Sequence, residues 1–201
     1  MVAGVATRPP LPPLRDRVRP GVRVLFVGIN PGIRSALIGH HFAGYSNRFW
    51  KLLFESGLVP ERITFEDDDR LPEWGYGITN LIPRPTPGIN DLLPAEYGAG
   101  WHGLERKVER FRPDVLAVVG VTVYRAILPL LVSERITKSH PVALGPQGEL
   151  VHGARVFVLP NPSGRNANFS YAEMLAAFTS LNRLLAAPRT RVRPRRRSTE
   201  P

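Results

Sequence analysis

The sequence has 201 residues, of which 43% are hydrophobic, with no cysteine and a formal net charge of +10. This length and composition indicate one globular domain without a membrane-spanning helix, which would need an apolar run of about 20 residues. The lack of cysteine excludes disulfides, thiolate metal sites and thiol nucleophiles, and the positive charge favours a polyanionic partner.

The chain begins with a segment rich in proline and arginine, residues 1–20, where a signal peptide would be apolar. We expect this segment to be a flexible lead and the protein to be cytoplasmic. The folded core is expected over 21–187, and the Arg-rich residues 188–201 as a disordered tail. That tail either only solubilises the protein or contacts DNA non-specifically, and the sequence leaves both open.

Within the core, short apolar runs alternate with helical patterns. Strands are expected over 22–28, 77–82, 114–120 and 155–160, and helices over 46–58 (with Ser46 as N-cap), 103–111, 122–131 and 170–187. Residues 66–70, EDDDR, are expected to form an acidic surface loop. This order predicts an α/β fold, a three-layer α/β/α sandwich with a short central parallel sheet.

Two similar turns follow strands directly, GINPG at 28–32 and LPNPSG at 159–164. Ligands of open parallel sheets bind outside the carboxyl ends of the strands, so Asn30 and Asn161 are expected to face a common cleft. Each turn also has a purely structural interpretation. Asn before Pro is common in turns, and Asn161 or Ser163 could cap the last helix.

The five histidines show no metal-binding spacing, so neither a metal nor a cofactor is expected. His40 and His41 are adjacent, and the other three are far apart in the sequence.

Four sequence motifs taken together indicate a family more specifically than either turn does alone. GINPG (28–32), GHHFAG with NRFWK (39–51), YGITNLIPRPTPG (76–88) and LPNPSGR (159–165) resemble the mismatch-directed uracil and thymine DNA glycosylases, over about residues 21–185. The resemblance implies the fold of uracil-DNA glycosylases. It also implies an enzyme that swings a nucleotide out of the duplex and hydrolyses its N-glycosidic bond.

The resemblance also assigns roles to individual residues. Asn30 holds the attacking water, since an amide can orient a nucleophile but cannot act as a strong base. The backbone N–H groups of Ile29 and Phe42 bind the uracil carbonyls, while the Phe42 ring stacks on the base. As an isolated aromatic, Phe42 would more often belong to the core.

On the same pattern Asn161 reaches towards the base, and Ser163, Gly164 and Arg165 contact DNA, with Gly164 and Arg165 as the wedge that fills the gap left by the flipped nucleotide. A lone arginine would more often be a phosphate contact. Ser35 occupies the position that senses a C5 methyl group and favours uracil, whereas Arg165 and GHH resemble the thymine-processing branch.

Asp91 is a tentative catalytic carboxylate that could stabilise the sugar cation. Its alternative is a solvated cap in the loop.

No unexplained apolar stripe stands out in the sequence, so a monomer is expected. The resemblance implies a glycosylase of base excision repair, expected to be monofunctional because neither GINPG nor LPNPSGR has a lysine to form a Schiff base. It would excise uracil, and possibly thymine or damaged pyrimidines, from mismatches with guanine in double-stranded DNA and leave an abasic site. Two other classes are alternatives: a phosphate or nucleotide hydrolase, for which GINPG lacks lysine and acidic metal ligands, and a non-catalytic DNA-binding module of the same fold.

Overall fold

The computed structural model describes residues 11–132 and 142–187. The strands are β1 (Val24–Gly28), β2 (Tyr76–Asn80), β3 (Val115–Val119), β4 (Gly145–Val151) and β5 (Ala154–Leu159). The helices are α1 (Ile33–Ile38), α2 (Phe49–Glu55), α3 (Pro94–Phe111), α4 (Val121–Leu131) and α5 (Tyr171–Ala186), with 3-10 segments η1 (Phe65–Trp74) and η2 (Ile89–Asp91). The expected tail, 188–201, lies outside the described residues.

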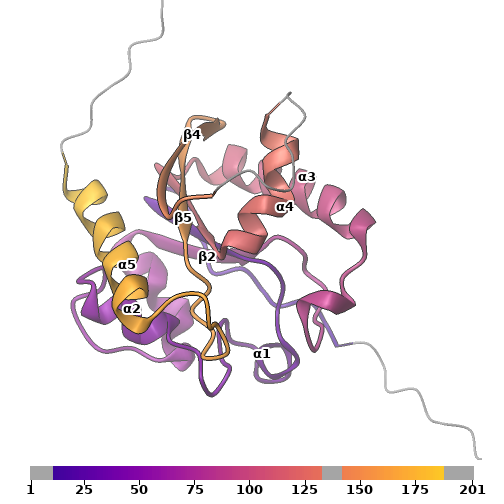
Figure 1. The fold of residues 1–201 in the computed structure, drawn as a ribbon, viewed down its shortest axis with the longest axis horizontal. Helices are drawn as coiled ribbons and strands as arrows, with labels where there is room; N and C mark the ends of the chain where they lie inside the picture. The colour runs from indigo at the N-terminus through magenta and orange to yellow at the C-terminus, as the bar shows by residue number, and fades with distance from the viewer. Residues whose placement is uncertain (1–10, 133–141, 188–201) are drawn as a thin grey trace, which may run out of the picture.

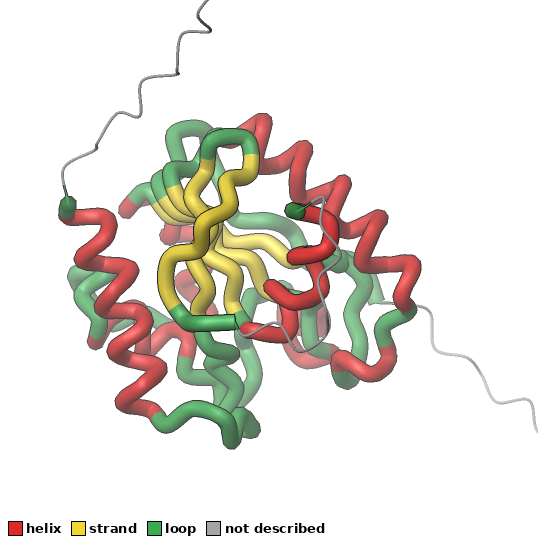
Figure 2. The backbone as a smooth tube through the Cα atoms, turned by 45° about the horizontal axis from the view of Figure 1, so that its top comes forward, coloured by secondary structure: helices red, strands yellow, loops and turns green. Residues whose placement is uncertain are grey.

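The strands form one sheet in the order β2-β1-β3-β5-β4, with β1, β2, β3 and β5 parallel. These four are the predicted apolar runs, and β1 and β3 are buried along their whole length because helices cover both faces. The predicted three-layer α/β/α architecture is confirmed (Figures 1 and 2). The expected short parallel sheet is formed by these four strands, and a fifth strand that was not expected, β4, pairs antiparallel with β5 at the edge.

Two apolar clusters hold the layers together. Phe26 of β1 meets Phe49 of α2 edge-on with ring centroids 5.3 Å apart, and α5 joins the same cluster through Phe178. The opposite face of the sheet packs on α3 and α4 through residues such as Trp101 and Ile127. The carboxyl ends of the parallel strands are left uncovered between these layers.

Two helices begin several residues from the expected position, and one helix was not expected. Helix α2 begins after Arg48, and the Asn47 side chain, not Ser46, accepts a hydrogen bond from the N–H of Phe49 at 2.9 Å. Helix α3 starts nine residues before the expected position, at Pro94, where Pro suits the first helical position. Helix α1 was not predicted, because six residues are too few to show a period.

The end of the expected flexible lead is bonded to the domain. Arg17 exchanges two backbone hydrogen bonds with Ile78, at 3.0 and 2.8 Å. The Asp16 carboxylate forms an ion pair with Lys107, with Oδ2 2.7 Å from Nζ. Because β2 is an edge strand, this pairing covers backbone groups that would otherwise be exposed. The structure therefore differs from the expectation at these residues, while residues 1–10 are not described.

Among the described residues, no helix combines the length and apolarity needed to cross a membrane.

Candidate active site

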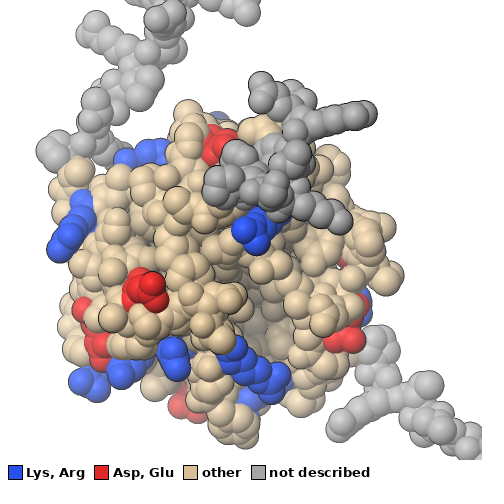
Figure 3. Space-filling model, in the orientation of Figure 1, with Lys and Arg blue, Asp and Glu red and all other residues tan. Residues whose placement is uncertain are grey.

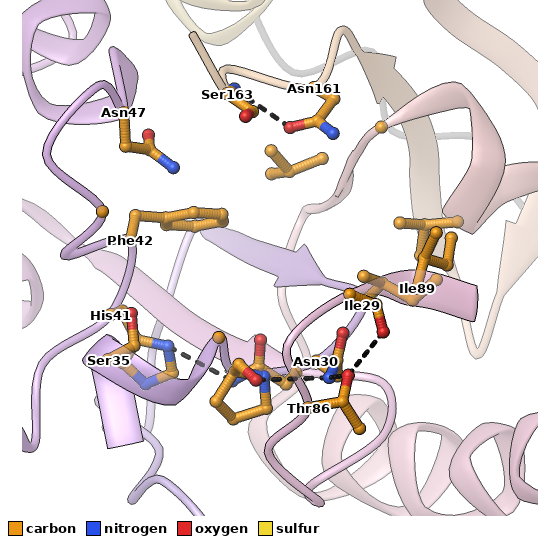
Figure 4. Close-up of a pocket in the computed structure, with 18 of the residues that line it drawn as sticks. Ile29, Asn30, Ser35, His41, Phe42, Asn47, Thr86, Ile89, Asn161 and Ser163 are labelled. Atoms are coloured by element: carbon orange, nitrogen blue, oxygen red, sulfur yellow. Dashed lines mark hydrogen bonds between the residues drawn. The ribbon is translucent and has the colours of Figure 1, made fainter. Parts of the chain in front are cut away.

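A cavity of about 440 Å³ opens at the carboxyl ends of the strands, within the size range of small-molecule sites. Turns after β1, β3 and β5 supply much of its wall, so the expected convergence of Asn30 and Asn161 on one cleft is observed (Figure 4). Most of the predicted residues line it: Ile29, Asn30, Ser35, Phe42, Asn161, Ser163 and Arg165. Gly164 and Asp91 do not.

The Asn30 amide is fixed by its nitrogen. Nδ2 donates to Thr86 Oγ1 at 2.7 Å and to the carbonyls of Pro31 and Arg84 at 3.2 Å each. Because carbonyls only accept, the nitrogen must face them, and the oxygen Oδ1 must point the other way. The hydrogen bonds of the Asn30 side chain within the described part of the chain are all made by Nδ2, so Oδ1 is available to accept a hydrogen bond from water.

The loop that holds Asn30 is itself anchored. Thr86 Oγ1 donates to the Gly88 carbonyl at 2.7 Å, and the Arg84 guanidinium binds both oxygens of Glu96 at 2.7 and 2.6 Å. The hydrogen bonds from Arg84, and next that from the N–H of Leu93, lower the pKa of Glu96 to about 2. The ion pair is therefore complete at neutral pH.

Phe42 forms a wall of the cavity (Figure 4). One face of its ring stacks on Phe49, with centroids 4.4 Å apart and an interplanar angle of 27°. Its φ of 50° is unusual for a bulky residue. The two interpretations of Phe42 are therefore compatible, since the ring touches the core and also lines the cavity.

The Ser35 hydroxyl is buried in α1 and accepts a hydrogen bond from the N–H of Ala43 at 3.1 Å. This bond joins α1 to the loop that carries Phe42. A methyl group in its place would remove the acceptor, so Ser35 holds this wall as well as lining it.

Asn161 and Ser163 form a compact turn. Asn161 Oδ1 accepts from the Ser163 N–H at 3.0 Å, and Ser163 Oγ accepts from the Arg165 N–H at 3.3 Å. Neither residue caps the last helix, because Ser170 does so. With its oxygen engaged, the Asn161 side chain has its Nδ2 donors left for a ligand.

The turn carrying Arg165 packs against the loop before α2. The N–H of Arg48 donates to the Pro162 carbonyl at 2.9 Å, and a Cβ on Gly164 would lie only 2.5 Å from Ser46 Cβ. The absence of a side chain at Gly164 therefore allows the two loops to meet. Arg165 is exposed at the rim, and Figure 3 shows a hollowed face bordered by Lys and Arg.

The Asp91 carboxylate accepts a hydrogen bond from the Gly88 N–H at 2.9 Å. It therefore has the capping geometry of the alternative interpretation and does not line the cavity. We assign it no catalytic role.

Asn80, which the sequence analysis did not single out, lines the cavity at the end of β2. Its neighbour is the buried His41, whose Nε2 lies 3.0 Å from the Arg15 carbonyl and whose Nδ1 lies 3.4 Å from Asn80 Nδ2. Because the carbonyl can only accept, Nε2 carries the proton and Nδ1 is an acceptor for Asn80. The sequence signal that could have identified Asn80 is its position at the end of a parallel strand.

The expectation of an acidic surface loop over 66–70 was wrong for Asp68, which is 0% exposed. Its carboxylate accepts from Arg17 Nε at 2.8 Å and from the His41 N–H at 2.9 Å, and it lies 3.1 Å from His40 Nδ1. A buried carboxylate requires such partners. Asp68 therefore fixes the loop that carries His41 and Phe42.

Burial lowers the pKa of His41 below its ordinary value. The hydrogen bond to the Arg15 carbonyl and the charges of Asp68 and Asp16 raise this pKa in part, and the charge of Arg17 lowers it further. Between this lowered pKa and the ordinary value of 6.5, the unfolded chain binds more protons than the folded one. The free energy of unfolding should therefore fall as the pH decreases below about 6.5, by at most about 1.4 kcal/mol per pH unit for one proton.

Thermal unfolding of the wild type and of His41→Gln, between pH 7.5 and 5, tests this expectation, since glutamine can keep a donor towards Arg15 but does not titrate. The wild type should lose more stability on acidification than the variant. Parallel pH curves for the two proteins would show that His41 does not bind a proton differentially.

Gly28 lies under the base of the cavity. A Cβ there would be 2.8 Å from Asn80 Oδ1 and 3.3 Å from Phe42 Cζ. Gly28→Ala should therefore displace the Asn80 and Phe42 side chains. It should slow the uracil release expected from the sequence about 10- to 100-fold, the usual effect of small misplacements in active sites.

The matched control is Gly103→Ala, in α3, where a Cβ meets no atom within 4 Å. It should leave the rate unchanged and stabilise the helix by about 0.5–1 kcal/mol. Equal rates for the two variants in single-turnover assays would contradict the assignment of the cavity.

In the described part of the chain, no group of three or more His, Asp or Glu residues could hold a metal ion. A family model described as the uracil DNA glycosylase superfamily matches residues 16–186, a span that contains all the residues lining the cavity except Leu14.

Proposed function

The chain belongs to the uracil DNA glycosylase superfamily, and from this premise we propose that its cavity binds a uracil flipped out of DNA and hydrolyses the N-glycosidic bond. The observation that supports this most strongly is the fixed amide of Asn30, which presents Oδ1 as an acceptor at the end of β1. The product is an abasic site. One chain supplies the described residues that line the cavity, which supports the proposal that a monomer suffices for activity.

Asn80 is suited to recognise the base. Its amide offers an acceptor and a donor side by side, which matches the N3–H and a neighbouring carbonyl of uracil. Cytosine has an acceptor at N3 and a donor at N4, and would need the amide reversed. His41 opposes that reversal, because its Nδ1 accepts from Asn80 Nδ2. Phe42 stacks on the base, and the N–H groups of Ile29 and Phe42 bind its carbonyls.

Asn30 is suited to position the water. Bond cleavage forms a sugar cation and a uracil anion, and uracil is a sufficiently good leaving group that orientation of the water matters more than proton abstraction. The donors around the base, including Asn161 Nδ2, stabilise the departing anion. No lysine is among the described residues that line the cavity, which supports a monofunctional reaction over Schiff-base chemistry.

We further propose that guanine mismatches are preferred. Arg165, at the tip of the turn that also contains Ser163 and Gly164, enters the duplex in place of the flipped nucleotide and donates to the unpaired guanine. Ser35 lines the cavity and holds the loop that carries Phe42, and we propose that it makes the enzyme favour uracil over thymine.

Single-turnover cleavage of matched oligonucleotides carrying G·U, G·T, A·U and unpaired U, followed by alkaline strand scission, tests this function. Cleavage should be fastest at G·U and much slower at G·T. Equal rates for G·U and A·U would reject the preference for mismatches, and binding without cleavage of any substrate would leave a non-catalytic DNA-binding module.

A further inference from the structure

Tyr45 is the most exposed large hydrophobic side chain of the described residues, with 89% of its surface accessible. It lies in the loop between α1 and α2. An aromatic ring this exposed is usually mobile, but here it has a partner. The Arg34 guanidinium lies over the ring with Cζ 3.8 Å from the centroid, and Arg34 Nη1 donates to the Tyr45 hydroxyl at 2.7 Å.

Arg34 is itself held in place. It projects from α1 and donates through Nε to the Ala43 carbonyl at 2.7 Å. The guanidinium therefore fixes one face of the Tyr45 ring and leaves the other open to solvent. A planar surface with a positive charge behind it suits a flat, electron-rich group such as a nucleobase.

The position of this pair relates it to the cavity. Gly44 and Asn47, on either side of Tyr45, both line the cavity. The intervening Ser46 meets Gly164, in the turn that carries Arg165. Tyr45 and Arg165 thus lie on two loops that touch, at the rim of one site.

The two side chains suit different DNA substrates. Arg165 requires an opposite strand, because its proposed partners are the base stack and the unpaired guanine. In a single strand that partner is missing, whereas the base beside the flipped nucleotide is free to leave its stack. Stacking of a base on an aromatic ring contributes about 1–3 kcal/mol and is nearly independent of sequence, because every base has a π face.

Resting on the proposed function, we propose that Tyr45, held by Arg34, is a stacking platform for the base next to the flipped nucleotide. The substrate class accordingly includes uracil in single-stranded DNA. In a duplex the neighbouring base stays paired and stacked, so the platform contributes less there.

Binding to a single strand and to a G·U duplex, both with a 2′-fluorinated deoxyuridine that resists cleavage, tests the platform in wild type, Tyr45→Ala, Tyr45→Trp and Arg165→Ala. Tyr45→Ala should weaken single-strand binding by about 5- to 150-fold, which corresponds to the energy of one stacked base, and duplex binding by clearly less. Tyr45→Trp should restore single-strand binding. Arg165→Ala should weaken binding to the G·U duplex more than binding to the single strand.

Unchanged single-strand binding in Tyr45→Ala, or equal losses on both probes, would overturn the platform. So would wild-type protein that cleaves the G·U duplex but does not bind the single strand, and in that case the proposed function would stand. Failure of the proposed function shows separately, as wild-type protein that releases no uracil from cleavable DNA of either kind. Because Tyr45 is exposed, its variants are expected to fold, and their thermal unfolding checks this.

Discussion

Replacing Asn30 with alanine is expected to slow uracil release in single-turnover assays about 10³-fold, the size of effect seen when one preorganised polar group is removed from a reacting centre. Oδ1 is the acceptor that orients the water, and alanine has none. Affinity for abasic DNA should change little, since Asn30 acts on the water and not on the DNA backbone. Asn90→Ala is the matched control, because Asn90 is exposed and does not line the cavity.

Asn30→Asp separates positioning from proton abstraction. The carboxylate would place an oxygen against the carbonyls of Pro31 and Arg84, where Nδ2 now donates. Acceptors repel one another there, so the side chain should rotate away and the rate should fall below that of the wild type. A rate at or above that of the wild type would instead identify residue 30 as the site of a general base, contrary to the proposed role.

Asn80→Ala is expected to lower kcat/KM for uracil about 10²-fold, because the donor and acceptor that match the base are lost. The defect should be confined to substrates that carry the base. Binding of abasic DNA, which has no base to recognise, is therefore the internal control. An equal loss of affinity for uracil-containing and abasic DNA would show that Asn80 supports the fold and does not recognise the base.

Much of the fold could be predicted because its buried strands are continuous apolar runs. The runs at β1, β3 and β5 have that property, and their parallel arrangement follows from the helices between them. Strand β4 was missed because GPQGELV contains two glycines and a proline and is half-exposed at the edge of the sheet.

The site was predictable where chain topology alone brings residues together. Asn30 and Asn161 each follow a strand, and parallel strands end at one edge, so their meeting needed no knowledge of side-chain contacts. Asn80 also ends a strand, but its significance depends on the tautomer of His41, which is set by a carbonyl from the distant residue Arg15. Such a contact leaves no local pattern in the sequence.

Asp68 shows the same difficulty in another form. In the sequence it is one of three consecutive aspartates, a pattern typical of a solvated loop, and its neighbours Asp67 and Asp69 are not buried. Its burial depends on Arg17 and the His40–His41 pair, which come from separate segments. Periodicity within the loop could not reveal partners so far away along the chain.

The central claim is that this cavity hydrolyses the bond between uracil and deoxyribose with a water held by Asn30. The most direct measurement incubates purified protein with a G·U duplex, then quantifies free uracil by chromatography and the treated strand by intact mass. Equimolar free uracil and abasic strand are expected from the wild type, and almost none from Asn30→Ala in the same time. Wild-type protein that binds the duplex but releases no uracil, or an Asn30→Ala variant as fast as the wild type, would contradict this claim.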